Sequence, residues 1–165
     1  MTKAETALAE FAGFHEGYVR HYIALADTKA AILLGLTSTF IAFLFSRPSF
    51  HDVLFKPSCS WQTWLVWAAV ALLLIGSGFA ARVIAPRLKH TGEGLVFFGA
   101  VRAYSSAEAY ADAVRSAGQD RLDDARLQHC YDVSAVCWRK YHSLRLAIWL
   151  SLAGFVASLP LIASI

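Results

Sequence analysis

Two oppositely charged residues mark the point where the chain passes from a mixed, polar sequence into an uncharged one. In the motif ADTKA, residues 26–30, Asp27 and Lys29 stand two positions apart. Two residues turn a helix by about 200°, so these side chains do not face each other. Charges beside a membrane interior are costly to bury and tend to have partners. We expect Lys29 to reach the lipid headgroups and Asp27 to face a cation such as Lys140 or Arg145.

This boundary motif supports two interpretations. In the first, Asp27 takes part in a purely structural ion pair at the membrane interface. In the second, it belongs to a ligand-binding or gating site. The residue types and their spacing leave both interpretations open.

Further basic residues fall just outside the apolar segments, and aromatic residues lie between them. Contact with anionic lipids is enough to explain such a basic cluster. The alternative is a pocket for an anionic small molecule, because Arg and Lys bind phosphate and an aromatic ring can stack on a base. The aromatic residues could equally be core. The candidates for a ligand-binding or gating site are Asp27, Lys29, Arg87, Phe97, Lys140 and Arg145.

The sequence lacks the motifs of common catalytic and metal sites. Its histidines form no H-E-x-x-H spacing, and its three cysteines form neither a disulfide framework nor a zinc signature. It has no G-x-S-x-G, P-loop or G-x-G-x-x-G motif. We therefore expect a protein that is not an enzyme and holds no metal or catalytic cofactor. The net charge of +3 gives no case for nucleic-acid binding.

The elements that position these residues are predicted to be membrane-spanning helices. The chain of 165 residues is 57% hydrophobic and only 16% charged, whereas soluble domains are about 25% charged. A bilayer core of about 30 Å requires a helix of about 20 apolar residues, and each span must satisfy its own backbone hydrogen bonds. Three uncharged windows qualify: residues 30–46, 61–81 and 146–165. The predicted fold class is an all-α membrane protein with three transmembrane helices.

The distribution of Lys and Arg predicts the orientation. Residues 1–29 and 82–145 together hold thirteen of these residues, the segment 47–60 holds two, and none follows the third window. Because positive charge collects on the cytoplasmic side, we place segments 1–29 and 82–145 in the cytoplasm. The segment 47–60 and the C-terminus are then outside.

The cytoplasmic segments are predicted to be helical and continuous with the spans. No proline interrupts residues 1–47, so one helix can run from about Lys3 through the first span. No helix breaker lies between Asp120 and Gly154, so the last helix enters the third span unbroken. We expect these two helices to pack together in a cytoplasmic bundle. The whole chain, residues 1–165, then forms a single membrane-embedded domain.

Smaller features predict how the remaining segments are arranged. Pro86 should end the second helix. Ser105 and Glu108 predict a capping box for a short helix to about residue 117, and Asp120 is expected to cap the last helix. The apolar segment GLVFFGAV, residues 94–101, is too short to span and predicts a buried turn or an interfacial segment.

One stretch of the chain resembles the first span of a known family. The sequence YIALADTKAAILL, residues 22–34, is similar to the signature of the Pycsar transmembrane effectors, of the pyrimidine cyclase system for antiphage resistance. The similarity extends in the same order over nearly the whole chain. The other matching features are Pro86-Arg87, Phe97-Phe98-Gly99, the helix around Tyr110, and Lys140-Tyr141.

The resemblance implies a function. A partner pyrimidine nucleotide cyclase, activated by phage infection, makes cyclic CMP or cyclic UMP. The effector binds that activating ligand and impairs the bacterial inner membrane, so that the cell stops growing or dies. Some relatives carry an added nucleotide-binding domain of the β-roll type, which this chain has no strand-rich segment to form. Any nucleotide must therefore bind the helical bundle itself.

Two further expectations follow. Three spans cannot form a roomy pore alone, so we expect a homo-oligomer in the lipid bilayer, with the N-terminus cytoplasmic and the C-terminus periplasmic. The alternative function is a non-enzymatic structural or regulatory subunit of a membrane complex. In that case the basic residues reflect only topology, and Asp27 only packing.

Overall fold

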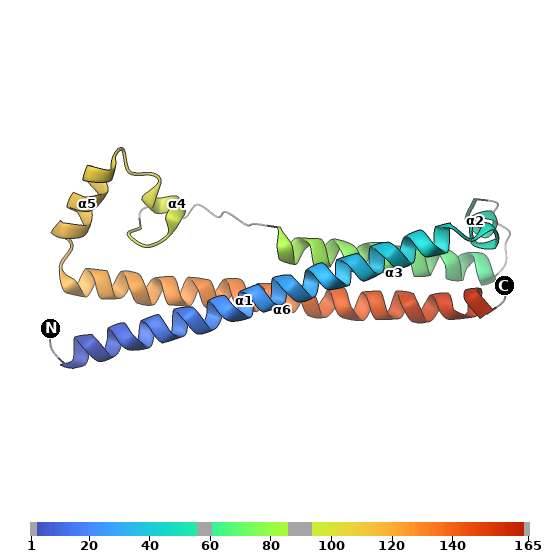
Figure 1. Cartoon of the computed structure of the whole chain (residues 1–165), viewed down its shortest axis with the longest axis horizontal. Helices are drawn as coiled ribbons and strands as arrows, with labels where there is room; N and C mark the ends of the chain where they lie inside the picture. Colours follow the sequence, from blue (N-terminus) through green and yellow to red (C-terminus); the bar gives the residue numbers. More distant parts are fainter. Residues whose placement is uncertain (1–2, 56–60, 86–93, 164–165) are drawn as a thin grey trace. The chain divides into compact units, whose positions relative to one another are not determined.

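Six helices form the described part of the chain. The computed structural model describes residues 3–55, 61–85 and 94–163, and these residues contain no strand. In chain order the helices are α1 (Lys3–Phe45), α2 (Pro48–Phe55), α3 (Trp61–Ile84), α4 (Phe98–Val101), α5 (Ala107–Ser116) and α6 (Gln119–Ala163) (Figure 1).

Three of these helices confirm the predicted fold class. By length and composition, α1, α3 and α6 can each cross a membrane. As predicted, α1 begins at Lys3 and continues without a break through the first apolar window. Helix α6 likewise runs unbroken from Gln119 and contains Pro160 near its end. The protein is therefore an all-α membrane protein, while the exact limits of its spans stay a prediction.

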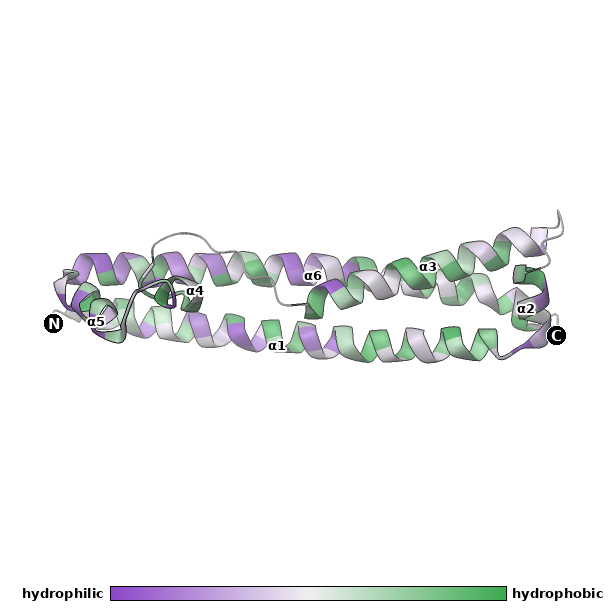
Figure 2. Ribbon diagram, turned by 90° about the horizontal axis from the view of Figure 1, so that it is seen from above, coloured by the Kyte–Doolittle hydropathy of each residue, from purple (hydrophilic) through white to green (hydrophobic). Residues whose placement is uncertain are grey.

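The chain divides into two compact units. We call Met1–Ile23 with Pro86–Trp138 the polar unit, and Ala24–Ala85 with Arg139–Ile165 the apolar unit. Helices α1 and α6 each contribute residues to both. In Figure 2, hydrophilic residues are concentrated in the first half of each of these helices, and hydrophobic residues in their second halves and in α3. Packing in the two units can thus be described separately.

In the apolar unit, small residues bring helices α3 and α6 close together. A Cβ atom built on Gly76 would lie 2.5 Å from Oγ of Ser151 and 3.2 Å from the carbonyl oxygen of Ala147. A Cβ on Gly154 would meet the side chain of Leu73 at 2.7 Å. Small residues at such crossings allow the close van der Waals packing on which helix association in lipid depends.

Helices α1 and α2 complete the core of the apolar unit. A buried cluster joins Leu44 of α1, Phe50 of α2 and Leu73 of α3. Oγ of Ser77 donates a hydrogen bond of 2.9 Å to Oγ1 of Thr37, which is fully buried. Residues 48–55, between the first two spans, thus form an eight-residue helix, and its Phe50 completes a core to which distant helices contribute.

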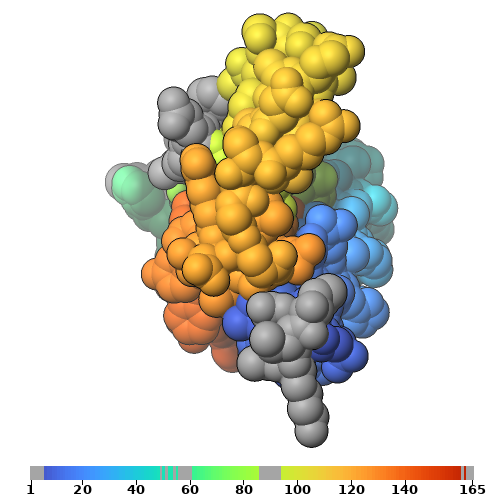
Figure 3. All heavy atoms as spheres, turned by 90° about the vertical axis from the view of Figure 1, so that its left-hand side faces the viewer, coloured from blue at the N-terminus to red at the C-terminus, as the bar shows by residue number. Residues whose placement is uncertain are grey.

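In the polar unit, the first part of α1 packs on the first part of α6. Ala12, Val19 and Cys130 are buried there. Nε2 of His15 and Oγ of Ser134 are 2.9 Å apart in a hydrogen bond. Figure 3 looks onto this unit and shows the first part of α6 (orange) beside α1 (blue), as in Figure 1.

Two predicted helix caps are wrong. The N-cap of α5 is Ser106, not Ser105, and its Oγ accepts from the N–H of Ala109 at 3.1 Å. Hydrogen bonds from its own backbone and from Ser106 hold the pKa of Glu108 below its usual value. Asp120 lies in the first turn of α6 rather than at its cap, because that helix already begins at Gln119. At α5 two adjacent serines compete for the cap, and α6 begins earlier than a cap at Asp120 requires; the sequence alone settled neither position.

Candidate functional site

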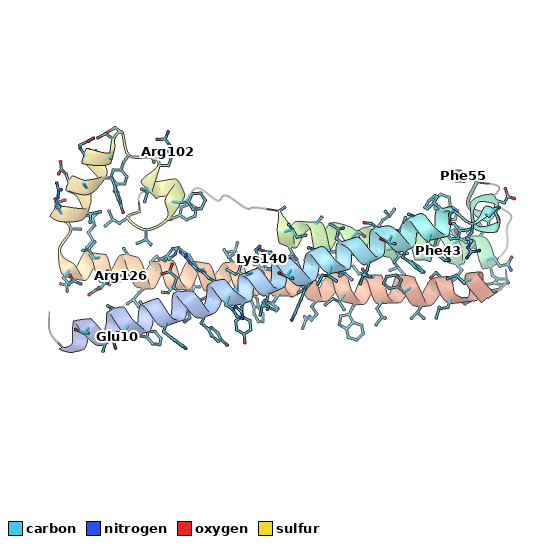
Figure 4. The ribbon with its side chains drawn as sticks, in the orientation of Figure 1. Glu10, Phe43, Phe55, Arg102, Arg126 and Lys140 are labelled. Carbon is cyan, nitrogen blue, oxygen red and sulfur yellow. The ribbon has the colours of Figure 1, made fainter. Side chains whose placement is uncertain are left out.

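Asp27 and Lys140 form an ion pair between α1 and α6 in the apolar unit. Nζ of Lys140 donates to Oδ1 of Asp27 at 2.5 Å. The lysine side chain is 19% exposed and the aspartate side chain 36% exposed. The structure thus selects Lys140 over Arg145 as the cation that faces Asp27. Figure 4 labels Lys140 midway along α6.

The packing on either side of the ion pair explains its position. Ala26 and Ala30 are fully buried against Val83 of α3 and Leu144 of α6. Alanines one turn apart on α1 bring its backbone close to the neighbouring helices. Asp27, which follows Ala26, is thereby placed at the edge of this contact with its carboxylate half-buried. A charge in such a place needs a partner, and Lys140 supplies it.

Of the other predicted residues, the structure describes Lys29, Arg145 and Phe97. Lys29 and Arg145 are exposed, as expected for side chains that reach toward headgroups. Arg87 lies outside the described residues. Phe97 belongs to the polar unit, where it lines a separate hollow. That the six candidates act as one site stays a prediction.

This hollow lies in the polar unit and has a volume of about 630 Å³. Pockets for small ligands typically measure about 300–1,000 Å³. One wall is the segment 94–97 with Ala100 and Tyr104. The other wall is one face of α6, formed by Arg121, Asp124, Ala125, Gln128, His129 and Asp132.

Two contacts fix the shape of the first wall. The hydroxyl of Tyr110 donates to the carbonyl oxygen of Leu95 at 2.9 Å, which ties this segment to α5. Gly99 has the ring of Phe97 folded against it, so a Cβ there would lie 2.6 Å from a ring carbon. A glycine at position 99 is thus needed for Phe97 to take this position. The segment predicted as a buried turn or an interfacial segment is a loop and a short helix with Leu95 and Ala100 buried, and it forms a wall of the hollow.

The second wall is where sequence analysis missed candidate residues. Positions 121, 125, 128 and 132 recur at helical spacing and therefore share a face of α6. Together with the neighbouring Asp124, this face combines a cation, carboxylates and an amide with the small residue Ala125. That pattern was readable in the sequence, but only the folded segment 94–104 shows what the face encloses.

Some polar side chains of this wall have a partner within the protein, and Arg121 makes no ion pair with a described residue. Nε2 of Gln128 donates to Oδ1 of Asp132 at 3.2 Å. His129 faces Glu16 of α1, with Nε2 and Oε1 3.5 Å apart. Arg121 is exposed and makes no ion pair within the described part of the chain. Chemically, the hollow offers one available cation, aromatic rings, and acceptors for hydroxyl or amine groups.

The fold and these two features define a class: a membrane protein with three apolar helices and a polar, helical unit that contains a ligand-sized hollow. Comparison with known proteins narrows this class. Residues 11–165 match the Pycsar effector protein domain, and the chain belongs to this family. It is also 24% identical over 149 residues to the Pycsar effector protein SaPycTM of Staphylococcus aureus, a match that covers 88% of this chain and 89% of that protein. No solved structure matches the chain significantly.

Proposed function

We propose that this protein is an antiphage effector that senses cyclic UMP or cyclic CMP and impairs the bacterial inner membrane, which stops growth or kills the infected cell. The observation that carries this proposal is the family match over residues 11–165. That match includes all three helices that can cross a membrane. A partner pyrimidine nucleotide cyclase would supply the ligand.

The continuity of two helices supports a mechanism. Helices α1 and α6 each contribute residues to both the polar and the apolar unit. A ligand that binds one packing of the polar unit better than another shifts the equilibrium between them. Because the same two helices continue into the apolar unit, that shift would change the packing of the membrane spans.

A stripe of exposed apolar residues on α1 supports assembly into a homo-oligomer. Phe11, Tyr18, Leu25 and Ile32 follow one another at seven-residue steps and are 62%, 53%, 36% and 59% exposed. A seven-residue apolar repeat is the pattern with which helices pair side by side. The repeat crosses from the polar into the apolar part of α1, so its partner must also cross that boundary. A second copy of α1 meets this requirement.

Purified protein in liposomes tests the proposal. The vesicles should contain a self-quenched dye, and cyclic UMP, cyclic CMP or the corresponding 5′-monophosphates should be added outside. We expect leakage with a cyclic pyrimidine nucleotide and none with the monophosphates. Leakage that does not depend on any nucleotide would contradict the sensing role, and an intact vesicle under every condition would contradict membrane impairment.

Orientation is tested separately. The excess of basic residues in segments 1–29 and 82–145 supports a cytoplasmic N-terminus and a periplasmic C-terminus. A reporter active only in the cytosol should therefore work when fused to the N-terminus and fail at the C-terminus. The reverse result would place the polar unit on the side opposite a cytoplasmic ligand.

A further inference from the structure

We infer that the hollow in the polar unit binds a mononucleotide with a single negative charge, its base against the rings of Phe97 and Tyr104 and its phosphate at Arg121. The inference rests on the proposed function for the ligand class. The position of the site comes from the hollow itself. Both walls belong to the polar unit, so the site does not depend on the arrangement of the two units.

The aromatic wall suits a planar base. The ring of Phe97 packs directly on Gly99, which has no side chain to displace it. The hydrogen bond from the hydroxyl of Tyr110 to the carbonyl oxygen of Leu95 holds the loop before Phe97. The ring of Tyr104 packs edge-to-face on Tyr110, with centroids 5.4 Å apart. Two rings that are fixed by their own neighbours offer a stacking surface without the entropic cost of ordering it.

Arg121 is the cation available for a phosphate. Arg126 is already paired with Asp123 at 3.6 Å and Arg115 with Asp112 at 3.3 Å, and Arg102 does not line the hollow. Arg121 makes no ion pair among residues that the structure describes. Its guanidinium can therefore give both of its parallel N–H groups to one phosphate.

The carboxylates of the hollow limit the charge of the ligand. Asp124 and Asp132 line the same face as Arg121, and like charges at close range repel. A triphosphate would meet two carboxylates and only one arginine, whereas a phosphodiester with one charge is matched by Arg121. The aspartates can then accept hydrogen bonds from a ribose hydroxyl or an exocyclic amine. Gln128 can bond the edge of the base.

His129 links the hollow to α1. It lines the hollow, and its Nε2 is 3.5 Å from Oε1 of Glu16. Glu16 also pairs with Arg20, so it keeps a cationic partner if His129 turns to a ligand. Occupation of the hollow would in this way compete with a contact between α6 and α1 inside the polar unit.

Calorimetry tests the site by measuring binding to the purified full chain in lipid-free detergent. Detergent removes anionic headgroups as competing occupants of Arg121. The probes are cyclic UMP, cyclic CMP, UMP and UTP. We expect a cyclic pyrimidine nucleotide to bind and UTP to bind at least tenfold more weakly.

Two pairs of variants locate the site. Arg121→Gln should weaken binding by about tenfold or more, whereas Arg126→Gln, on the same helix but outside the hollow, should change it little. Phe97→Leu should weaken binding by about tenfold. Phe14→Leu is its control, because Phe14 is 71% exposed and does not line the hollow. Binding is compared only among variants whose unfolding temperature matches that of the wild type.

The outcomes separate this inference from the proposed function. If a cyclic nucleotide binds and triggers vesicle leakage but Arg121→Gln and Phe97→Leu bind it as the wild type does, the site is wrong and the function stands. If the two variants lose binding but the wild type causes no leakage, the site stands and the function is wrong. If UMP binds and the cyclic nucleotides do not, the inferred preference for a single negative charge is wrong, because a 5′-monophosphate carries nearly two at neutral pH. Failure of every mononucleotide to bind overturns the inference.

Discussion

The contacts inside the apolar unit differ in kind from the contacts inside the polar unit. In the apolar unit, fully buried small and apolar residues meet at helix crossings, as Ala26, Ala30 and Leu73 do. In the polar unit, α5 buries none of its residues, and hydrogen bonds such as that between His15 and Ser134 connect α1 to α6. Tight packing suits the unit whose solvent is lipid. A unit with fewer buried contacts opens and rearranges at lower cost, as a ligand-responsive region must.

The largest expected effect tests the tight packing of the apolar unit. Gly76→Val should destabilise the protein by about 3 kcal/mol, because its side chain would meet the backbone of α6 around Ser151. Gly78→Val is the matched control, since a Cβ there has no atom within 4 Å, and it should change stability by about 0.5 kcal/mol or less. Thermal unfolding in detergent measures both. Equal effects would show that the crossing is looser than described.

The ion pair at the edge of the apolar unit should give a smaller effect. Asp27→Ala leaves the mostly buried Lys140 without its partner and should cost about 1–2 kcal/mol, less than a fully buried pair because Asp27 is partly exposed. Lys29→Ala, at an exposed position in the same motif, should cost little. Chemical denaturation of the single variants and of the double variant with Lys140→Ala isolates the pair.

The same variant separates the two functions considered for the chain. In an effector, Asp27→Ala should abolish toxicity in cells that contain the partner cyclase, while the protein still inserts into the membrane. In a structural subunit, it should instead lower the abundance of the complex. Quantitative blotting of the membrane fraction beside growth curves distinguishes these results.

In the polar unit, loss of one hydrogen bond should have a measurable effect. Ser134→Ala removes the partner of His15 and should cost about 1 kcal/mol. Ser116→Ala, whose hydroxyl bonds only to a carbonyl of its own helix at an exposed site, should cost less. Hydrogen exchange of the first turns of α1 reports the change locally. No increase in exchange would mean that this contact does not hold α1 to α6.

The smallest effect is expected for a hydrogen bond inside the apolar unit. Thr37→Val removes the acceptor of Ser77 and should cost about 0.6 kcal/mol, the average for side-chain hydrogen bonds between membrane helices. Thr28→Val, at an exposed position whose hydroxyl bonds only to Ala24, is its control. If Thr37→Val cost more than Ser134→Ala, polar contacts would matter more in the apolar unit than in the polar unit.

The sequence alone determined the helices and much of what each must do. The uncharged windows and the missing prolines were enough to predict α1 and α6 as continuous helices, because periodicity and helix breakers act locally along the chain. The motif ADTKA was enough to predict that Asp27 needs a cation, since a charge at a membrane boundary rarely stands alone. Both predictions follow from the properties of the bilayer as a solvent and from the geometry of a single helix.

Only the tertiary structure decided which residues meet. It selected Lys140 rather than Arg145 for Asp27, and it placed Phe97 in the lining of a hollow that Arg121 also lines. It also showed that Gly76 lies at a helix crossing and Gly78 does not. These outcomes depend on the rotation of one helix against another and on the path of a short loop. Such choices follow from packing between distant segments, which the spacing of residues along a single segment does not encode.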